Sequence, residues 1–120
     1  MQAAGCCAKM IHMANVRNYA KELDKIMDAL RRENKRPTLL LHACCAPCSS
    51  AVLERLTAAF DMTVLFYNPN IAPEAEYEKR AAELARLIRE MPAAQGVQMV
   101  CAPYDAKEFL DAVRGLEQVP

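Results

Sequence analysis

Three cysteines stand close together near the middle of the chain, at Cys44, Cys45 and Cys48. They follow an apolar strand pattern at 38–43 and precede a helix pattern, so we expect them at the tip of a strand-to-helix turn. Thiolates are soft ligands for iron and zinc, and a Cys-x-x-Cys spacing can close around one metal ion or one edge of a cluster. The spacing therefore predicts a metal site formed by Cys44, Cys45 and Cys48.

The adjacent pair, Cys44 and Cys45, adds a geometric argument. Neighbouring side chains generally diverge, which favours a multinuclear cluster over a single zinc ion. The N-terminus of the following helix would also lower the pKa of a nearby thiol and so favour the thiolate. A thiolate is required both for metal binding and for nucleophilic attack.

The same residues permit a second hypothesis without metal. Cys45 and Cys48 flank Ala-Pro, which matches the Cys-x-Pro-Cys form of thioredoxin-like dithiol oxidoreductases at a strand-to-helix junction. In either hypothesis Cys45 and Cys48 are the predicted catalytic residues. Against the dithiol hypothesis, the chain has no tryptophan and no proline directly before its third strand pattern.

Composition narrows the class of protein. The chain has 120 residues, 53% of them hydrophobic, which suits one modest domain. Acidic and basic residues number 15 each, so overall charge indicates no partner. No apolar stretch has the length of a membrane span or a signal peptide, and we expect a cytoplasmic protein with no membrane partner. In that reducing compartment six cysteines indicate metal or redox chemistry more than disulfides.

Strand patterns occur at 38–43, 62–67 and 97–102. Helix patterns occur at 15–35, after Pro47, at 74–91 and after Asp105, so that a helix pattern follows each strand pattern. This alternation predicts an α/β fold with a Rossmann-like parallel sheet, preceded by an N-terminal helix. We expect the first strand to be buried on both faces, and Asp105 with Glu108 to form a capping box. The apolar stripe of the second helix is predicted from Ala51, Val52, Leu56 and Phe60.

The predicted organisation has three parts: a flexible N-terminus at 1–13, an N-terminal helix at 14–36 and a partial Rossmann-like α/β domain at 37–120. The thiols and the loop 68–73 would meet beyond the carboxyl ends of the strands, where such sheets bind ligands. Cys101, in a strand pattern, is expected to be a small buried residue, and we assign no function to Cys6 and Cys7.

Three ordered motifs resemble the QueH type of epoxyqueuosine reductase. They are LLLHACCAPCS at 39–49, FYNPNIAP at 66–73, and Glu-Tyr-x-x-Arg ending at Arg80. The resemblance implies a Rossmann-like fold of the adenine-nucleotide α-hydrolase kind and a [4Fe–4S] cluster. It also implies reduction of epoxyqueuosine to queuosine in tRNA, with tRNA as a partner and an electron donor of unknown identity.

In that family the adjacent cysteines, here Cys44 and Cys45, help to hold the [4Fe–4S] cluster, and a neighbouring mononuclear iron site is also known. Cys48 occupies a position where a metal ligand fits. The same motifs imply substrate contacts, and the alternative is that the asparagines only shape a turn and the arginine only pairs with Glu76. The candidate substrate-binding residues are Asn68, Asn70, Tyr77 and Arg80.

Three further expectations concern neighbouring positions. His42 is either a core histidine or a hydrogen-bond donor to a cluster sulfur. The basic residues Arg31, Arg32, Lys35 and Arg36 form either a solvated helix end or a contact to the tRNA backbone. Members of the family carry a further Cys-x-x-Cys after the region matching 115–117 and a later redox-active pair, so we expect this chain to be an N-terminal portion with an incomplete domain.

Overall fold

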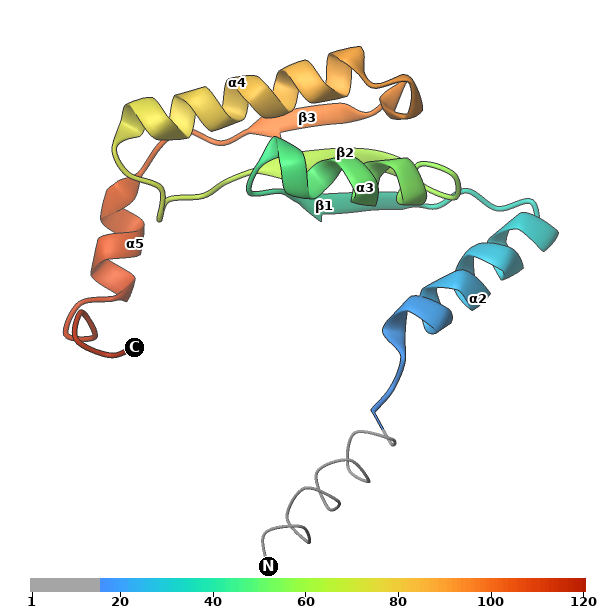
Figure 1. The fold of residues 1–120 in the computed structure, drawn as a ribbon, viewed down its shortest axis with the longest axis horizontal. Helices are drawn as coiled ribbons and strands as arrows, with labels where there is room; N and C mark the ends of the chain where they lie inside the picture. The colour runs from blue at the N-terminus through green and yellow to red at the C-terminus, as the bar shows by residue number, and fades with distance from the viewer. Residues whose placement is uncertain (1–15) are drawn as a thin grey trace, which may run out of the picture. The chain divides into compact units, whose positions relative to one another are not determined.

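The computed structural model describes residues 16–120 (Figure 1). The chain divides after Lys35 into two units. The predicted flexible N-terminus at 1–13, with Cys6 and Cys7, lies outside the described residues. Within the described residues no helix combines the length and the apolar character needed to cross a bilayer.

The described part of the first unit is built around helix α2 (Tyr19–Arg32), which confirms the helix expected within 15–35. Asn18 caps the helix, because its side-chain oxygen accepts a hydrogen bond from the backbone N–H of Lys21 at 3.1 Å. A capping side chain satisfies one of the free donors of the first turn. Local sequence signals therefore define where this helix begins.

The second unit is an open three-stranded parallel sheet in which the strands lie side by side in chain order. In the register, Thr38 pairs with Asp61 and Thr63 pairs with Gln98. This arrangement confirms the predicted α/β class and is consistent with a Rossmann-like fold. In chain order the elements are β1 (Thr38–His42), α3 (Ala46–Leu56), β2 (Asp61–Phe66), α4 (Glu74–Glu90), the 3-10 turn η1 (Pro92–Ala94), β3 (Gln98–Cys101) and α5 (Ala106–Ala112).

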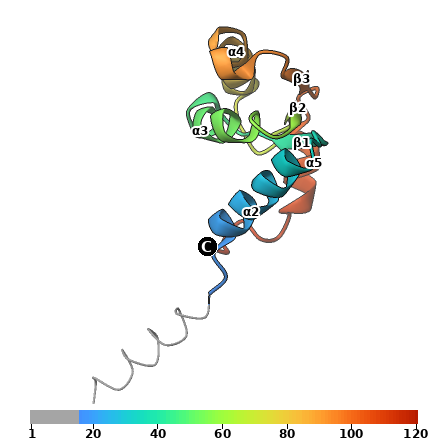
Figure 2. The same cartoon turned by 90° about the vertical axis from the view of Figure 1, so that its right-hand side faces the viewer.

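Helices α3 and α4 lie on the same side of the sheet (Figure 2). The core forms between these helices and the sheet, where four large side chains are fully buried. Burial of each such side chain stabilises the fold by about 1.5–3 kcal/mol relative to leaving it exposed. The four residues are Phe66, Leu53, Leu84 and Val64.

The opposite face of the sheet carries exposed apolar side chains. Leu40 on β1 is 63% exposed and Val100 on β3 is 51% exposed. The expectation that β1 is buried on both faces is therefore wrong, because its burial alternates from residue to residue. Consecutive crossovers that advance in one direction along a parallel sheet place their helices on one face, and α3 and α4 do so here.

The burial pattern of α3 also differs from the prediction. Its buried residues are Ser49 and Leu53, whereas Ala51 and Val52 are exposed. Phe60 lies beyond the end of the helix and packs, partly buried, against the core. The helix begins at Ala46, with a proline in its first turn, and this start sets which face turns inward.

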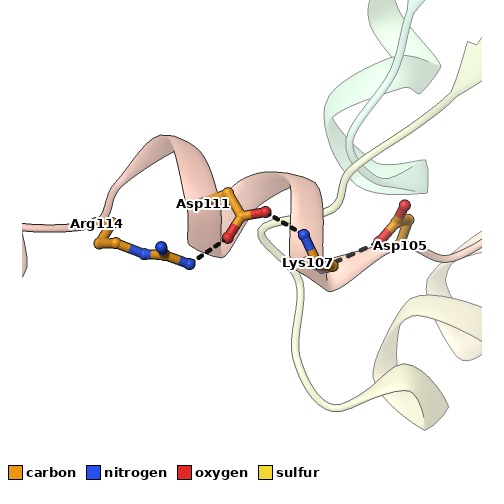
Figure 3. Close-up of polar contacts among 4 residues, drawn as sticks. All are labelled: Asp105, Lys107, Asp111 and Arg114. Atoms are coloured by element: carbon orange, nitrogen blue, oxygen red, sulfur yellow. Dashed lines mark hydrogen bonds and ion pairs between the residues drawn. The ribbon is translucent and has the colours of Figure 1, made fainter.

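Helix α5 begins at Ala106 and is capped by Asp105, whose side chain accepts a hydrogen bond from the backbone N–H of Lys107 at 3.1 Å. Figure 3 shows this cap together with the ion pairs that Lys107 and Arg114 make with Asp111. Exposed pairs at these spacings stabilise a helix by a few tenths of a kcal/mol each, about 0.2–0.5. Asp105 thus starts the helix as expected.

The predicted capping box at this helix is wrong in its second half. The Glu108 carboxylate does not bond to the backbone N–H of Asp105, as a capping box requires. It accepts a hydrogen bond from the Tyr67 hydroxyl instead. Tyr67 directly follows β2, so this contact links α5 to the carboxyl edge of the sheet. A tertiary partner has displaced the local one.

Candidate metal centre

The thiol turn, residues 43–48, lies at the carboxyl end of β1. Cys45 has an extended backbone, with φ −163° and ψ 162°, and is the N-cap residue of α3. Cys48 lies in the first turn of that helix. The sulfur atoms of Cys44, Cys45 and Cys48 all lie within 4.8 Å of one another, and the structure thereby brings the three predicted metal ligands together.

The adjacent thiols converge, contrary to the expectation that they diverge. The Sγ atoms of Cys44 and Cys45 are 3.7 Å apart. Tetrahedral coordination with Zn–S bonds of about 2.3 Å places neighbouring sulfur ligands about 3.8 Å apart. The spacing of this pair therefore suits ligands of one ion, and the geometric argument for a multinuclear cluster does not hold. Cys44 and Cys48 are exposed and have room to rotate.

Cys45 and Cys48 differ in acidity. A hydrogen bond from the backbone N–H of Cys48 lowers the pKa of Cys45, and the Cys48 side chain adds to this effect. The hydrogen bond between the Cys45 and Cys48 side chains raises the pKa of Cys48, and the negative charge on Cys45 raises it further. Hydrogen bonds to a charged form favour that form. Cys45 is therefore the first of this pair to become a thiolate.

Two buried polar side chains support the thiol turn. The Ser49 hydroxyl donates to the carbonyl oxygen of Cys45 at 2.7 Å, and the Asn68 amide donates to that of Ala43 at 2.9 Å. Sequence reasoning missed Ser49, because a serine in a helix carries no signal that its hydroxyl bonds to the turn before it.

His42 lies on the exposed face of β1, so the expectation of a core histidine is wrong. Its Nε2 atom is 2.7 Å from the carbonyl oxygen of Tyr67. Because a carbonyl only accepts hydrogen bonds, Nε2 carries the proton in this contact. The structure thus assigns this ring nitrogen a backbone partner in place of a sulfur atom.

Cys101 is exposed, and the expectation that it is a buried apolar residue is wrong. It occupies the last position of β3 and pairs in register with Phe66. Its exposure follows from its place at the end of an edge strand. Cys101 is not part of the close group formed by the three thiols of the turn.

The four candidate substrate-binding residues fall into two classes. Tyr77 is 3% exposed; its ring packs against Phe66 and Tyr104, and its hydroxyl donates to the carbonyl oxygen of Ala102 at 2.5 Å. Burial raises the pKa of Tyr77, which keeps the hydroxyl protonated. A ring enclosed in this way is not available for stacking on a base.

Asn68 belongs to the same class, since it is 5% exposed and its amide is bonded to Ala43. Asn70, by contrast, is exposed on the loop between β2 and α4. Arg80 is partly exposed and bonds to Glu76 at 2.7 Å, and its charge also contributes to lowering the pKa of Cys45. Asn70 and Arg80 are therefore the accessible members of the predicted set.

A small hollow of about 100 Å³ adjoins the thiol turn, and His42, Cys44, Cys48 and Val52 are among its lining residues. Pockets that bury a drug-sized ligand usually measure about 300–1,000 Å³. This hollow is too small for such a ligand. It has room for water or a small group beside the sulfur atoms.

Most of the basic run already has partners. Arg31 pairs with Asp28 and Lys35 pairs with Glu33. Arg36 bonds to Asp61 at 2.6 Å and also to two backbone carbonyls. Arg36 therefore has a structural role at the start of the sheet, and contact of the run with the tRNA backbone stays a prediction.

Comparison with known proteins supplies the family. The chain matches the family described as epoxyqueuosine reductase QueH over residues 39–120. This chain belongs to the QueH family. The matched segment contains the sheet, except for its first residue, and the thiol turn. No solved structure matches the chain.

Individual QueH relatives agree with this result. The chain is 41% identical over 105 residues to the epoxyqueuosine reductase QueH of Streptococcus pyogenes serotype M1, covering 86% of this chain and 41% of that protein. It is 42% identical over 83 residues to that of Histophilus somni, covering 68% of this chain and 32% of the relative. The chain thus spans less than half the length of these curated QueH relatives.

Proposed function

We propose that this chain provides the metal-binding part of an epoxyqueuosine reductase, which reduces epoxyqueuosine to queuosine in tRNA. The observation that carries this proposal is the close group of three thiols at the carboxyl edge of a parallel sheet, in a chain of the QueH family. Reducing an epoxide to an alkene consumes two electrons and two protons and releases water. An external electron donor is therefore required.

Cys44, Cys45 and Cys48 are the residues that would hold the proposed [4Fe–4S] cluster. Thiolates are the usual ligands of such clusters, and because each would bind a different iron, the exposed Cys44 and Cys48 would rotate away from their present close positions to do so. A bound cluster would supply electrons and, at an open iron position, a Lewis acid. The lowered pKa of Cys45 makes its thiolate available as the first ligand.

Asn70 and Arg80 are the residues that we propose to contact the tRNA substrate. The Arg80 guanidinium carries a positive charge near the thiol turn. Its Nε atom bonds to Glu76, which fixes one side of the guanidinium group, while the side chain stays partly exposed. A guanidinium in this position suits a phosphate or a polar base edge. Asn68 and Tyr77 would act indirectly, by holding the backbone.

A dithiol oxidoreductase is the second candidate function, and the opposed pKa shifts of Cys45 and Cys48 favour it. A pair with one acidic thiol is the arrangement that thiol–disulfide exchange uses. The two candidates differ in what they require of Cys44. Metal binding uses all three thiols, whereas dithiol exchange uses only Cys45 and Cys48.

The test is anaerobic reconstitution of the full 120-residue chain with iron and sulfide. We expect bound iron and sulfide in the parent, with a visible absorption band, and a large loss of both in Cys45→Ser and Cys44→Ser. Cys101→Ser is the matched control, because this exposed thiol lies outside the group, and it should retain the parent's iron content. Conversion of epoxyqueuosine would then be followed in isolated tRNA by mass spectrometry of its nucleosides.

Two results would contradict the proposal. A parent chain that takes up no iron under these conditions would exclude the metal site. Iron uptake that is unchanged in Cys44→Ser and Cys45→Ser would show that the metal lies elsewhere. If instead the parent binds no iron but forms a reversible Cys45–Cys48 disulfide in both the parent and Cys44→Ser, the dithiol function would replace it.

A further inference from the structure

Buried polar side chains are rare in this structure. Among the described residues, apart from Tyr77 with its hydroxyl, only Ser49 and Asn68 fall in this class, at 4% and 5% exposed. Burying a hydroxyl or an amide has a cost unless the group is hydrogen-bonded. Both side chains are bonded, and both partners are backbone carbonyls of the thiol turn.

The two bonds flank the adjacent cysteines. Asn68 holds the carbonyl oxygen of Ala43, the residue before Cys44, and Ser49 holds the carbonyl oxygen of Cys45. The donors come from different elements, since Asn68 follows β2 and Ser49 lies in α3. The backbone on both sides of the Cys44–Cys45 pair is therefore fixed from two independent directions.

We propose that Ser49 and Asn68 are positioning residues that hold the thiol turn in a conformation in which the three sulfur atoms converge. This inference rests on the proposed thiolate metal site and extends it to residues that touch no metal. Adjacent side chains ordinarily diverge, so the 3.7 Å separation of the Cys44 and Cys45 sulfurs requires a particular backbone path. The two buried bonds supply that constraint.

Helix α3 offers a matched control for Ser49 at its other end. The Thr57 hydroxyl donates to the carbonyl oxygen of Leu53 at 2.7 Å, with the same spacing of four residues and the same length as the bond from Ser49 to Cys45. Thr57→Val removes the hydroxyl and keeps the shape of the side chain. It therefore reports the loss of an equivalent bond far from the sulfur atoms.

The experiment is a titration of the anaerobic, reduced 120-residue chain with Co²⁺, followed through the thiolate-to-cobalt charge-transfer band. Removing a group that orients metal ligands typically weakens metal binding about 10–100-fold. We expect weakening of about tenfold or more in Ser49→Ala and in Asn68→Ala. Thr57→Val should bind Co²⁺ like the parent, and Ser49→Thr should retain most of the affinity because it keeps the hydroxyl.

Urea unfolding of the same variants separates positioning from simple loss of stability. We expect Ser49→Ala and Thr57→Val to lower the unfolding midpoint to a similar extent, while only Ser49→Ala weakens Co²⁺ binding. Folded Ser49→Ala and Asn68→Ala variants with the parent's Co²⁺ affinity would overturn the inference. If Asn68→Ala does not fold, the comparison of Ser49→Ala with Thr57→Val decides the question alone.

A second probe tests the same geometry without cobalt. Phenylarsine oxide captures two neighbouring thiols by forming two As–S bonds and releasing water, with no change in the oxidation state of sulfur. We expect slower capture by Ser49→Ala and Asn68→Ala than by the parent and Thr57→Val. Equal rates in all four would overturn the positioning role. A parent that captures the arsenical but binds no Co²⁺ would instead count against the proposed metal site.

Discussion

The two ends of the sheet are held by side chains of opposite character. At the amino end one partly exposed cation, Arg36, bonds to the Asp61 carboxylate and to the carbonyls of Thr57 and Phe60. At the carboxyl end the exposed His42 bonds to the Tyr67 carbonyl, and three further donors to backbone carbonyls are uncharged and buried. These three are Ser49, Asn68 and Tyr77.

The difference corresponds to what each end must do. An exposed arginine tolerates movement, because water can replace any of its bonds at small cost. A buried amide or hydroxyl has no such substitute, and losing its partner costs about 1–3 kcal/mol. Buried donors therefore occur at the end where the proposed metal site requires three sulfur atoms to keep their positions. The amino end, with no such requirement, is joined by a surface contact.

The largest expected effect concerns the reactivity of the carboxyl end. Because the pKa of Cys45 is lowered and that of Cys48 is raised, Cys45 forms its thiolate at the lower pH. At a pH below both pKa values, each unit of difference between them changes the ratio of the two thiolate fractions about tenfold. We expect iodoacetamide to modify Cys45 first near neutral pH, with Cys48 following as the pH rises. Peptide mass spectrometry across pH measures both rates.

Exposed Cys101 provides a reference thiol in the same digest. Equal midpoints for Cys45 and Cys48, or earlier modification of Cys48, would contradict this prediction. Cys45 should also react more slowly relative to Cys101 in Cys48→Ala, which removes the hydrogen bond from the Cys48 side chain and keeps the larger contribution of the Cys48 backbone N–H.

A smaller effect is expected from Tyr77→Phe. The change removes the hydroxyl that donates to the Ala102 carbonyl at 2.5 Å and leaves the packed ring in place. One buried hydrogen bond is worth about 1 kcal/mol of unfolding free energy. Urea unfolding should show this loss at low and at high salt alike, because neither partner is charged. A loss that disappears in high salt would contradict the distinction between the two ends.

The smallest effect is expected from Arg36→Met. Its bond to Asp61 joins two side chains that are each more than half exposed, and such pairs contribute about 0–1 kcal/mol. We expect a decrease in unfolding free energy below about 1 kcal/mol at low salt, and a smaller decrease near about 1 M salt, where charges are screened. If Arg36→Met lost more unfolding free energy than Tyr77→Phe, and lost it independently of salt, the amino end would be the more rigidly held one.

The sequence was sufficient to predict the order of strands and helices and the place of the thiols. Period-two and period-3.6 patterns report local structure directly, and the Cys-x-x-Cys spacing indicates candidate ligands from only four residues. The faces of the sheet could not be predicted in this way. An apolar run such as Leu39, Leu40 and Leu41 does not show whether a second layer covers it, and Leu40 is exposed.

The roles of Asn68 and Tyr77 were also beyond the sequence. Asparagine directly before proline, as at Asn68, is typical of a turn, and nothing local shows that its amide reaches the Ala43 carbonyl, 25 residues earlier. Tyr77 bonds to Ala102, another 25 residues away. Long-range partners of this kind depend on how parallel strands align, which spacing along the chain does not encode.

The apolar side chains on the bare sheet face have a practical consequence. Leu40 and Val100 reach solvent in the fully folded second unit. Fluorescent dyes such as ANS, whose binding is commonly taken as the sign of a loosened molten state, respond to exposed apolar surface of any origin. Dye fluorescence from this chain would therefore report its native surface, and near-ultraviolet circular dichroism is the better indicator of intact packing.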